Sequence, residues 1–260
     1  MSRTFASTQK EKKMGIDFEK MKEKRDSLLN KDPAREVFWK PQDGDTVIRI
    51  VPTADGDPFK EYWFHYNLGK NPGFLSPKKN FGDSDPLDDF VRKLFNERSD
   101  DSIKMAKNLM ARQRFFAPVI VRGEEERGVQ IWGFGKRVYQ DLLELVLNPD
   151  YGDVTDPESG TDLKITYGKP PGAQFPVTNI TPRRRSSVLS EDDELAAQWL
   201  DTIPDFAGVF DRKTPEEVGV LLDEWLAGEQ VVEDTGSTAA TSDAKSPSTV
   251  DQAFTDLLGA

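Results

Sequence analysis

The apolar residues of this sequence fall in short runs, and the longest, 115–121, spans seven residues and includes a proline. A helix that crosses a membrane needs roughly 20 consecutive apolar residues, so the sequence predicts no such helix. Alternation of apolar and polar positions between turn residues instead predicts short strands. They are expected at 46–51, 61–68, 112–122, 129–134, 163–167 and 175–181.

Helical periodicity and capping signals predict four helices among these strands. Asp85 followed by Pro86 is typical of an N-cap with proline at the first helical position, and Thr214 with Glu217 is typical of a capping box. The helices are expected at 85–98, 136–147, 191–203 and 214–227, and the Gly-, Pro- and Lys-rich residues 69–84 are expected to form a long loop. The pattern indicates an α+β fold with a small twisted or barrel-like sheet.

The strand at 112–122 has two unlike faces. Its odd positions from 115 to 121 are apolar, whereas its even positions present Arg112, Arg114 and Phe116 at one end and Arg122 at the other. Because successive side chains of a strand point to opposite faces, we expect one face to pack in the core. The other face is expected to attract anions.

Charge is separated along the chain, which has a net charge of -11. Residues 1–40 carry a net charge of +4 and residues 41–185 of -1, whereas residues 186–228 carry -9 and residues 229–260 carry -5. Such separation is expected when one surface meets a polyanion and another part of the chain is kept away from it or competes with it.

Three regions follow from these shifts in composition. Residues 1–36 form a basic arm, residues 37–228 a folded core, and residues 229–260 an acidic tail that is expected to begin as a disordered linker. The end of the tail has apolar residues at helical spacing with aspartates between them, typical of a peptide that docks on a partner. Its candidate docking residues are Asp251, Phe254, Asp256, Leu257 and Leu258.

The chemistry of common enzyme sites is largely missing. The chain has no cysteine and one histidine, His65, which excludes disulfides, thiolate zinc sites and cysteine nucleophiles. The glycines at 133 and 135 match neither the phosphate loop nor the dinucleotide motif. We therefore expect no enzyme activity, cofactor or metal, and a cytoplasmic protein, because the first residues lack the apolar core of a secretory signal.

Single-stranded nucleic acid is bound through cations that contact phosphates and aromatic faces on which bases stack. Both kinds of residue occur in the same predicted elements. The candidate groove residues are Arg49, Trp63, Lys70, Lys78, Lys79, Phe81, Arg112, Arg114, Phe116, Lys136 and Arg137.

Two alternatives stay open. The aromatic rings can instead belong to the core of a protein-interaction scaffold that is docked by the acidic tip, with the basic strand as ordinary surface. A magnesium-dependent nuclease is the other alternative. It would use Asp83, Asp85, Asp88 and Asp89, which helix capping also explains.

Four segments in order carry a resemblance to a known family: VIRIVP (47–52), RFFAPVIV (114–121), IWGFGKRVY (131–139) and DLKITY (162–167). Over residues 37–185 the sequence resembles the replication single-stranded DNA-binding proteins of T-even-type bacteriophages, in the form found in marine phages. The basic arm and the acidic tail follow the same plan.

The resemblance implies an OB-fold core that binds single-stranded DNA without sequence preference during replication, recombination and repair in the infected host cell. It also implies cooperative self-association through the arm and recruitment of partner proteins through the tail. By position, it assigns the DNA cleft to Arg49, Arg112, Arg114, Phe115, Phe116, Lys136 and Arg137, bordered by Arg183, Arg184 and Arg185. Arg3, Thr4 and Lys10 loosely match the family's arm motif.

One feature departs from the family. Its founding member holds a structural zinc through one histidine and three cysteines, and His65 occupies the place of that histidine. Residues 67–89 contain no cysteine, so the zinc site cannot form in the same way. We expect packing to hold this segment instead.

Overall fold

The computed structural model describes residues 37–69, 71 and 73–233. All of them belong to one compact unit. The predicted arm, the candidate residue Lys70 and the tip with its five candidate docking residues lie outside the described residues. Helix α9 (Pro215–Glu233) continues past residue 228, so the predicted end of the core falls within a helix.

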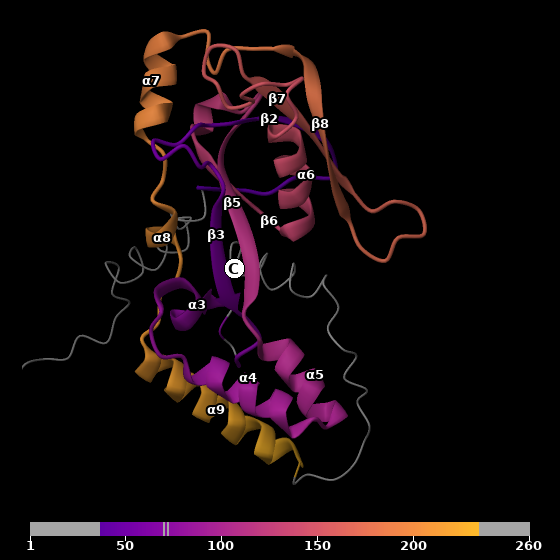
Figure 1. The fold of residues 1–260 in the computed structure, drawn as a ribbon, viewed down its shortest axis with the longest axis vertical. Coiled ribbons are helices and arrows are strands. Elements are labelled where there is room, and N and C mark those ends of the chain that lie inside the picture. Colours follow the sequence, from indigo (N-terminus) through magenta and orange to yellow (C-terminus); the bar gives the residue numbers. More distant parts are fainter. Residues whose placement is uncertain (1–36, 70, 72, 234–260) are drawn as a thin grey trace, which may run out of the picture. The chain divides into compact units, whose positions relative to one another are not determined.

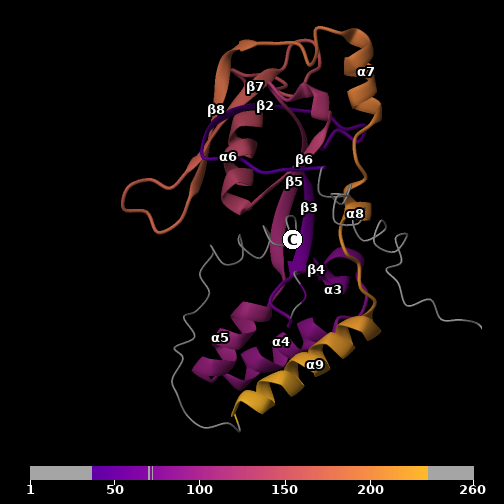
Figure 2. The ribbon, with the colours of Figure 1, turned by 180° about the vertical axis from the view of Figure 1, so that it is seen from behind.

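The described strands form one eight-stranded sheet, and seven helices and one 3-10 turn accompany it (Figures 1 and 2). The strands are β1 (Phe38–Trp39), β2 (Gly44–Ile50), β3 (Lys60–His65), β4 (Phe74–Leu75), β5 (Arg112–Val121), β6 (Gln130–Phe134), β7 (Thr161–Gly168) and β8 (Val177–Ser186). The order is β1-β6-β5-β2-β7-β8, with β3 joined to β5 and β4. The α+β class is confirmed, but the sheet is open and does not close into the predicted small barrel.

Strand β5 is the centre of this sheet. Its first half pairs with β3 and its last residues pair with β2 on the same edge, while β6 occupies the other edge. The odd residues of β5 lie in a core cluster that helix α6 (Lys136–Val146) covers with Val138, Leu142 and Leu145. The prediction that the odd positions of this strand pack in the core is confirmed.

The even face of β5 is covered as well. Phe116 packs in a second cluster with Phe206 and Phe210 around helix α8 (Phe206–Val209), and Ile120 packs against Trp199 of helix α7 (Asp193–Asp201). Both side chains are fully buried. The predicted bare, anion-attracting face is therefore mostly core, because segments far along the chain return to cover it.

Three helices form a separate apolar cluster with Leu68 and with Phe74 of β4. Helices α4 (Pro86–Glu97), α5 (Asp100–Leu109) and α9 contribute to it. Asp85 and Pro86 begin α4 as predicted, and the Thr214–Glu217 capping box of α9 is formed in both directions. The predicted loop 69–84 was wrong in part, since it contains β4 and the short helix α3 (Pro77–Phe81).

Candidate nucleic-acid interface

The first turn of α6 presents two exposed cations, Lys136 and Arg137. The helix begins where Gly135 ends β6, and no side chain caps its N-terminal N–H groups. Because the N-terminal end of a helix carries partial positive charge, cations are unfavourable there and anions favourable. No described residue forms an ion pair with either cation, so this turn is suited to a phosphate.

A third cation, Arg114, lies directly behind this turn. Strand β5 places it opposite Tyr62 of β3, and its side chain reaches Gly135, where an added methyl group would lie 3.4 Å from Nη1. Arg114 is 8% exposed. Its side chain therefore stays within the fold, next to the start of α6.

Trp63 is a candidate stacking residue that is partly exposed. Asn80 of α3 holds the Trp63 backbone, accepting from its N–H at 2.9 Å and donating to its carbonyl at 2.7 Å. The neighbouring Lys79 places its ammonium group 5.4 Å from the centre of the indole ring. Helix α3 thus brings together a cation and an aromatic face, the pair that a stacked nucleotide requires.

Arg112 is half-buried and tied to helix α5. Its guanidinium donates to the carbonyl of Lys107, whose own side chain is exposed. Burial lowers the pKa of Arg112 below its usual value, which still leaves it charged at neutral pH. Helix α5, which carries Lys107, was not predicted.

Arg183, Arg184 and Arg185 lie on β8, at the edge of the sheet, and all three are exposed. The prediction had ended this strand at residue 181. Helix α6 contacts β8, so the elements that carry the two exposed cationic groups are neighbours. No described residue forms an ion pair with these arginines.

Arg49 is not part of a surface. It is fully buried and binds Asp162 at 3.0 Å, the carbonyls of Asp156, Gly160 and Ser187, and the Ser187 hydroxyl. Burial lowers its pKa, and the charge of Asp162 opposes that effect. Arg122 binds the same carboxylate at 3.0 Å. Arg49 and Arg122 therefore connect the sheet internally, which corrects the expected place of Arg49 in the DNA cleft and of Arg122 on a face that attracts anions.

Two aromatic candidates lie in the core, and a third is partly buried. Phe115 is 2% exposed and stacks on Tyr139 at 3.9 Å between ring centres, and Phe116 is 0% exposed. Phe81 is partly buried beneath the guanidinium of Arg212, 3.8 Å from its ring centre. Buried faces are closed to bases in this structure, which corrects Phe115 and Phe116 as cleft residues and leaves Phe81 covered by a cation.

His65 forms a buried polar network. Its Nε2 lies 3.0 Å from Asp85 Oδ2 and its Nδ1 lies 3.1 Å from the Leu109 carbonyl, while the Ser76 hydroxyl donates to the same Asp85 oxygen. Burial alone would raise the pKa of Asp85, but the hydrogen bonds and charge that face it lower the pKa to about 2. A polar network, in addition to packing, holds this segment together.

The four aspartates of the nuclease alternative all have other partners. Asp85 caps α4, Asp88 binds Lys78 at 2.8 Å, Asp89 binds Arg92, and Asp83 lies 3.3 Å from Arg212. Among the described residues there is no group of three or more His, Asp or Glu side chains that could hold a metal ion.

Fold and surface together define an open-sheet α+β protein with cationic groups at one helix start and one sheet edge. No protein-family model matches the chain, and no curated protein is similar to it. Within the described residues, every helix is too short or too polar to span a membrane.

Proposed function

We propose that this protein binds single-stranded DNA cooperatively and without sequence preference, in replication, recombination and repair. The first turn of α6 carries the proposal. Two exposed cations stand there at an uncapped helix N-terminus, with Arg114 behind them. This arrangement opposes the helix dipole, and it becomes favourable when a phosphate neutralises it.

In this proposal, bases stack on Trp63 rather than on the phenylalanines of β5. Its partly exposed side chain and the Lys79 ammonium group offer one stacking face beside one phosphate contact. Base stacking on such a ring contributes about 1 to 3 kcal/mol without sequence preference. An OB-type core remains part of the proposal in its partly open form.

The tails complete the proposal. Residues 1–36 would mediate self-association, and the acidic tail would recruit replication and recombination proteins and compete with DNA for the cations. Because α9 continues to Glu233, the tail is best removed as residues 234–260. Its removal should tighten binding to single-stranded DNA at low salt, where charge competition is strongest.

The test is a titration of the full chain against fluorescent oligothymidine and against a duplex of equal length. We expect tight, salt-sensitive binding that strongly favours the single strand, with quenching of tryptophan emission as bases stack on Trp63. A Trp63→Leu variant should lose most of the quenching, whereas Trp225→Leu, altered in the helical cluster, should keep it. Weak binding to both DNAs would overturn the proposal and favour the interaction scaffold.

A further inference from the structure

Glu61 is an exposed acidic residue of β3 that touches the ring of Trp63. It lies two positions before Trp63 on the strand, so both side chains project from the same face of the sheet. The Trp63 indole Nε1 donates a hydrogen bond to Glu61 Oε1 at 2.7 Å. The carboxylate therefore holds the edge of the ring on which bases are proposed to stack.

The same carboxylate lies close to helix α6. Strand β3 pairs Glu61 with Phe115 of β5, and the Phe115 ring stacks on Tyr139 of α6. Burial raises the pKa of Tyr139, and the charges of Asp57 and Glu61 raise it further. Tyr139 follows Lys136 by three residues, which places both on one side of the helix. Glu61 thus lies near the stacking ring and near the side of α6 that begins at Lys136.

The protein does not neutralise the charge of Glu61 through an ion pair with any described residue. A phosphate that binds at the first turn of α6 must approach this negative charge, and like charges repel, more strongly at low salt. The carboxylate therefore has two opposite effects on a bound nucleotide. It supports the stacked base through the ring, and it disfavours the phosphate through its charge.

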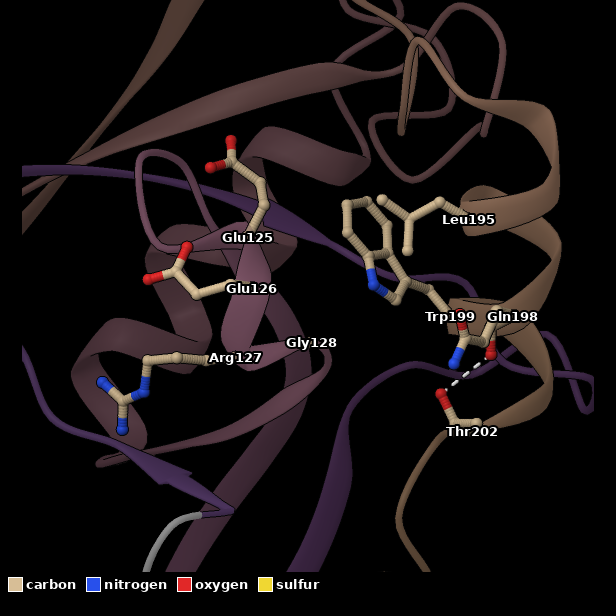
Figure 3. A pocket seen from close by; sticks show the side chains of 8 residues that line it. All are labelled: Glu125, Glu126, Arg127, Gly128, Leu195, Gln198, Trp199 and Thr202. Atoms are coloured by element: carbon tan, nitrogen blue, oxygen red, sulfur yellow. Dashed lines mark hydrogen bonds between the residues drawn. The ribbon is translucent and has the colours of Figure 1, made fainter.

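A second tryptophan lies near two carboxylates but is held differently. Trp199 lines a pocket of about 320 Å³ between helix α7 and the 3-10 segment η1 (Glu125–Arg127) (Figure 3). Glu125 and Glu126 line the same pocket, but Figure 3 shows their carboxylates turned away from the indole ring. Trp199 is 3% exposed and packs in a core cluster. Of these two rings, that of Trp63 is the one that is partly exposed and held at its edge by a carboxylate.

We propose that Glu61 is a positioning residue that orients Trp63 for base stacking and at the same time limits the affinity for the phosphate backbone. This inference rests on the proposed function, because it concerns the same site. The hydrogen bond from the indole needs an acceptor oxygen but no charge, and the amide of glutamine supplies such an oxygen. Glu61→Gln should therefore keep the ring in place and remove the repulsion, whereas Glu61→Ala should remove both.

The test is a titration of the full-chain wild type, Glu61→Gln and Glu61→Ala with oligothymidine at low and at high salt. It records the affinity and the part of the tryptophan quenching that Trp63→Leu abolishes. We expect Glu61→Gln to bind about threefold more tightly than the wild type at low salt and to keep the wild-type quenching, with a smaller gain at high salt. Glu61→Ala should lose about half of that quenching or more. The same two changes at Glu224, an exposed residue of α9, should alter neither quantity.

Three results would overturn the inference while the proposed function stands. They are wild-type quenching in Glu61→Ala, wild-type affinity in Glu61→Gln at low salt, and an equal loss of quenching in both variants, which would show that the ring depends on the charge rather than on the acceptor oxygen. If the wild type binds no oligothymidine, the proposed function fails and this inference fails with it.

Discussion

Asp162 holds two arginine side chains, Arg49 and Arg122, within the fold. A buried charge is tolerated only when it is paired and its remaining hydrogen-bonding groups are satisfied. Arg49 meets this condition through Asp162, three carbonyls and the Ser187 hydroxyl. These partners join β2 to residues 156–162 and to the segment after β8, so the arginine stabilises a connection across the sheet.

Replacing Arg49 with methionine should destabilise the protein by about 3 kcal/mol, because it removes one partner of a buried ion pair. Urea unfolding measures this change. Lys164→Met, which breaks the more exposed pair with Asp45, should cost less than about 1 kcal/mol. Oligothymidine affinity of the folded Arg49→Met protein should stay unchanged. Unaltered stability with weakened DNA binding would instead place Arg49 in the interface.

Asp85 makes stability depend on pH in the acid range. Its pKa falls from 3.8 to about 2 in the folded protein, and at 1.36 kcal/mol per unit this corresponds to roughly 2 kcal/mol. Since the folded pKa is depressed, this contribution is present above pH 4 and is lost as pH falls toward 2. Asp85→Asn should therefore lose stability at neutral pH and show a weaker decline between pH 4 and pH 2.

Urea midpoints measured across this range provide the check, with Asp89→Asn as the control. Asp89 lies on the same helix but is exposed and pairs with Arg92, so its removal should leave the acid profile nearly unchanged. Equal profiles for wild type and Asp85→Asn would show that the network around His65 does not stabilise the fold.

At the residue scale, contacts between distant parts of the chain could not be predicted from the sequence. The alternation of apolar and polar residues placed Arg49 and Phe116 correctly on strands. It could not reveal that Asp162, 113 residues away, would bind Arg49. It also could not show that Phe206 and Phe210 would cover Phe116. Lys136 and Arg137 were found because a basic pair directly after Gly135 is a local signal.

At the scale of elements, capping residues and apolar spacing correctly predicted helix starts and strand or helix type. Helices α4 and α9 begin at their expected caps, and β5 and α6 follow their expected apolar spacing. Strand β4 was missed because two residues are held by pairing with β3 and a bridge to Arg212, not by their own propensity. Strand β8 continues through Arg183–185 as an irregular segment between its Leu163–Pro182 and Thr161–Ser186 pairs with β7, which no local signal of the sequence predicts.

The start of α6 allows a test in which stability and binding move in opposite directions. Lys136→Glu should stabilise the protein by about 0.5 kcal/mol, because an acidic residue suits the first turn of a helix. The same change should weaken oligothymidine binding on the order of fivefold to tenfold at low salt. Thermal unfolding and fluorescence anisotropy measure the two effects.

Lys93→Glu, an equal charge reversal at an exposed position of α4, should change DNA affinity by less than about twofold. If Lys136→Glu raised stability but left affinity unchanged, α6 would not contact DNA. If it lowered both, the basic turn would have a structural role that the helix dipole does not explain.

At the scale of the whole molecule, charge separation along the sequence persists in the folded elements. Helix α7 and the first turn of α9 are acidic, whereas the first turn of α6 and the end of β8 are basic. A net charge of -11 therefore does not argue against binding to a polyanion, because binding depends on the local potential rather than on the sum.

The central claim is that exposed cations at the start of α6 bind the phosphates of single-stranded DNA. The most direct measurement is the affinity for fluorescent oligothymidine over a series of salt concentrations, for the wild type and for Lys136→Ala/Arg137→Ala. Each phosphate contact contributes a slope of about -0.7 in log K against log salt for a single strand. The account predicts that the double variant binds more weakly and that its slope is shallower by roughly 1.4, while Lys93→Ala keeps the wild-type slope. Equal slopes for wild type and double variant, or no measurable binding by the wild type, would contradict it.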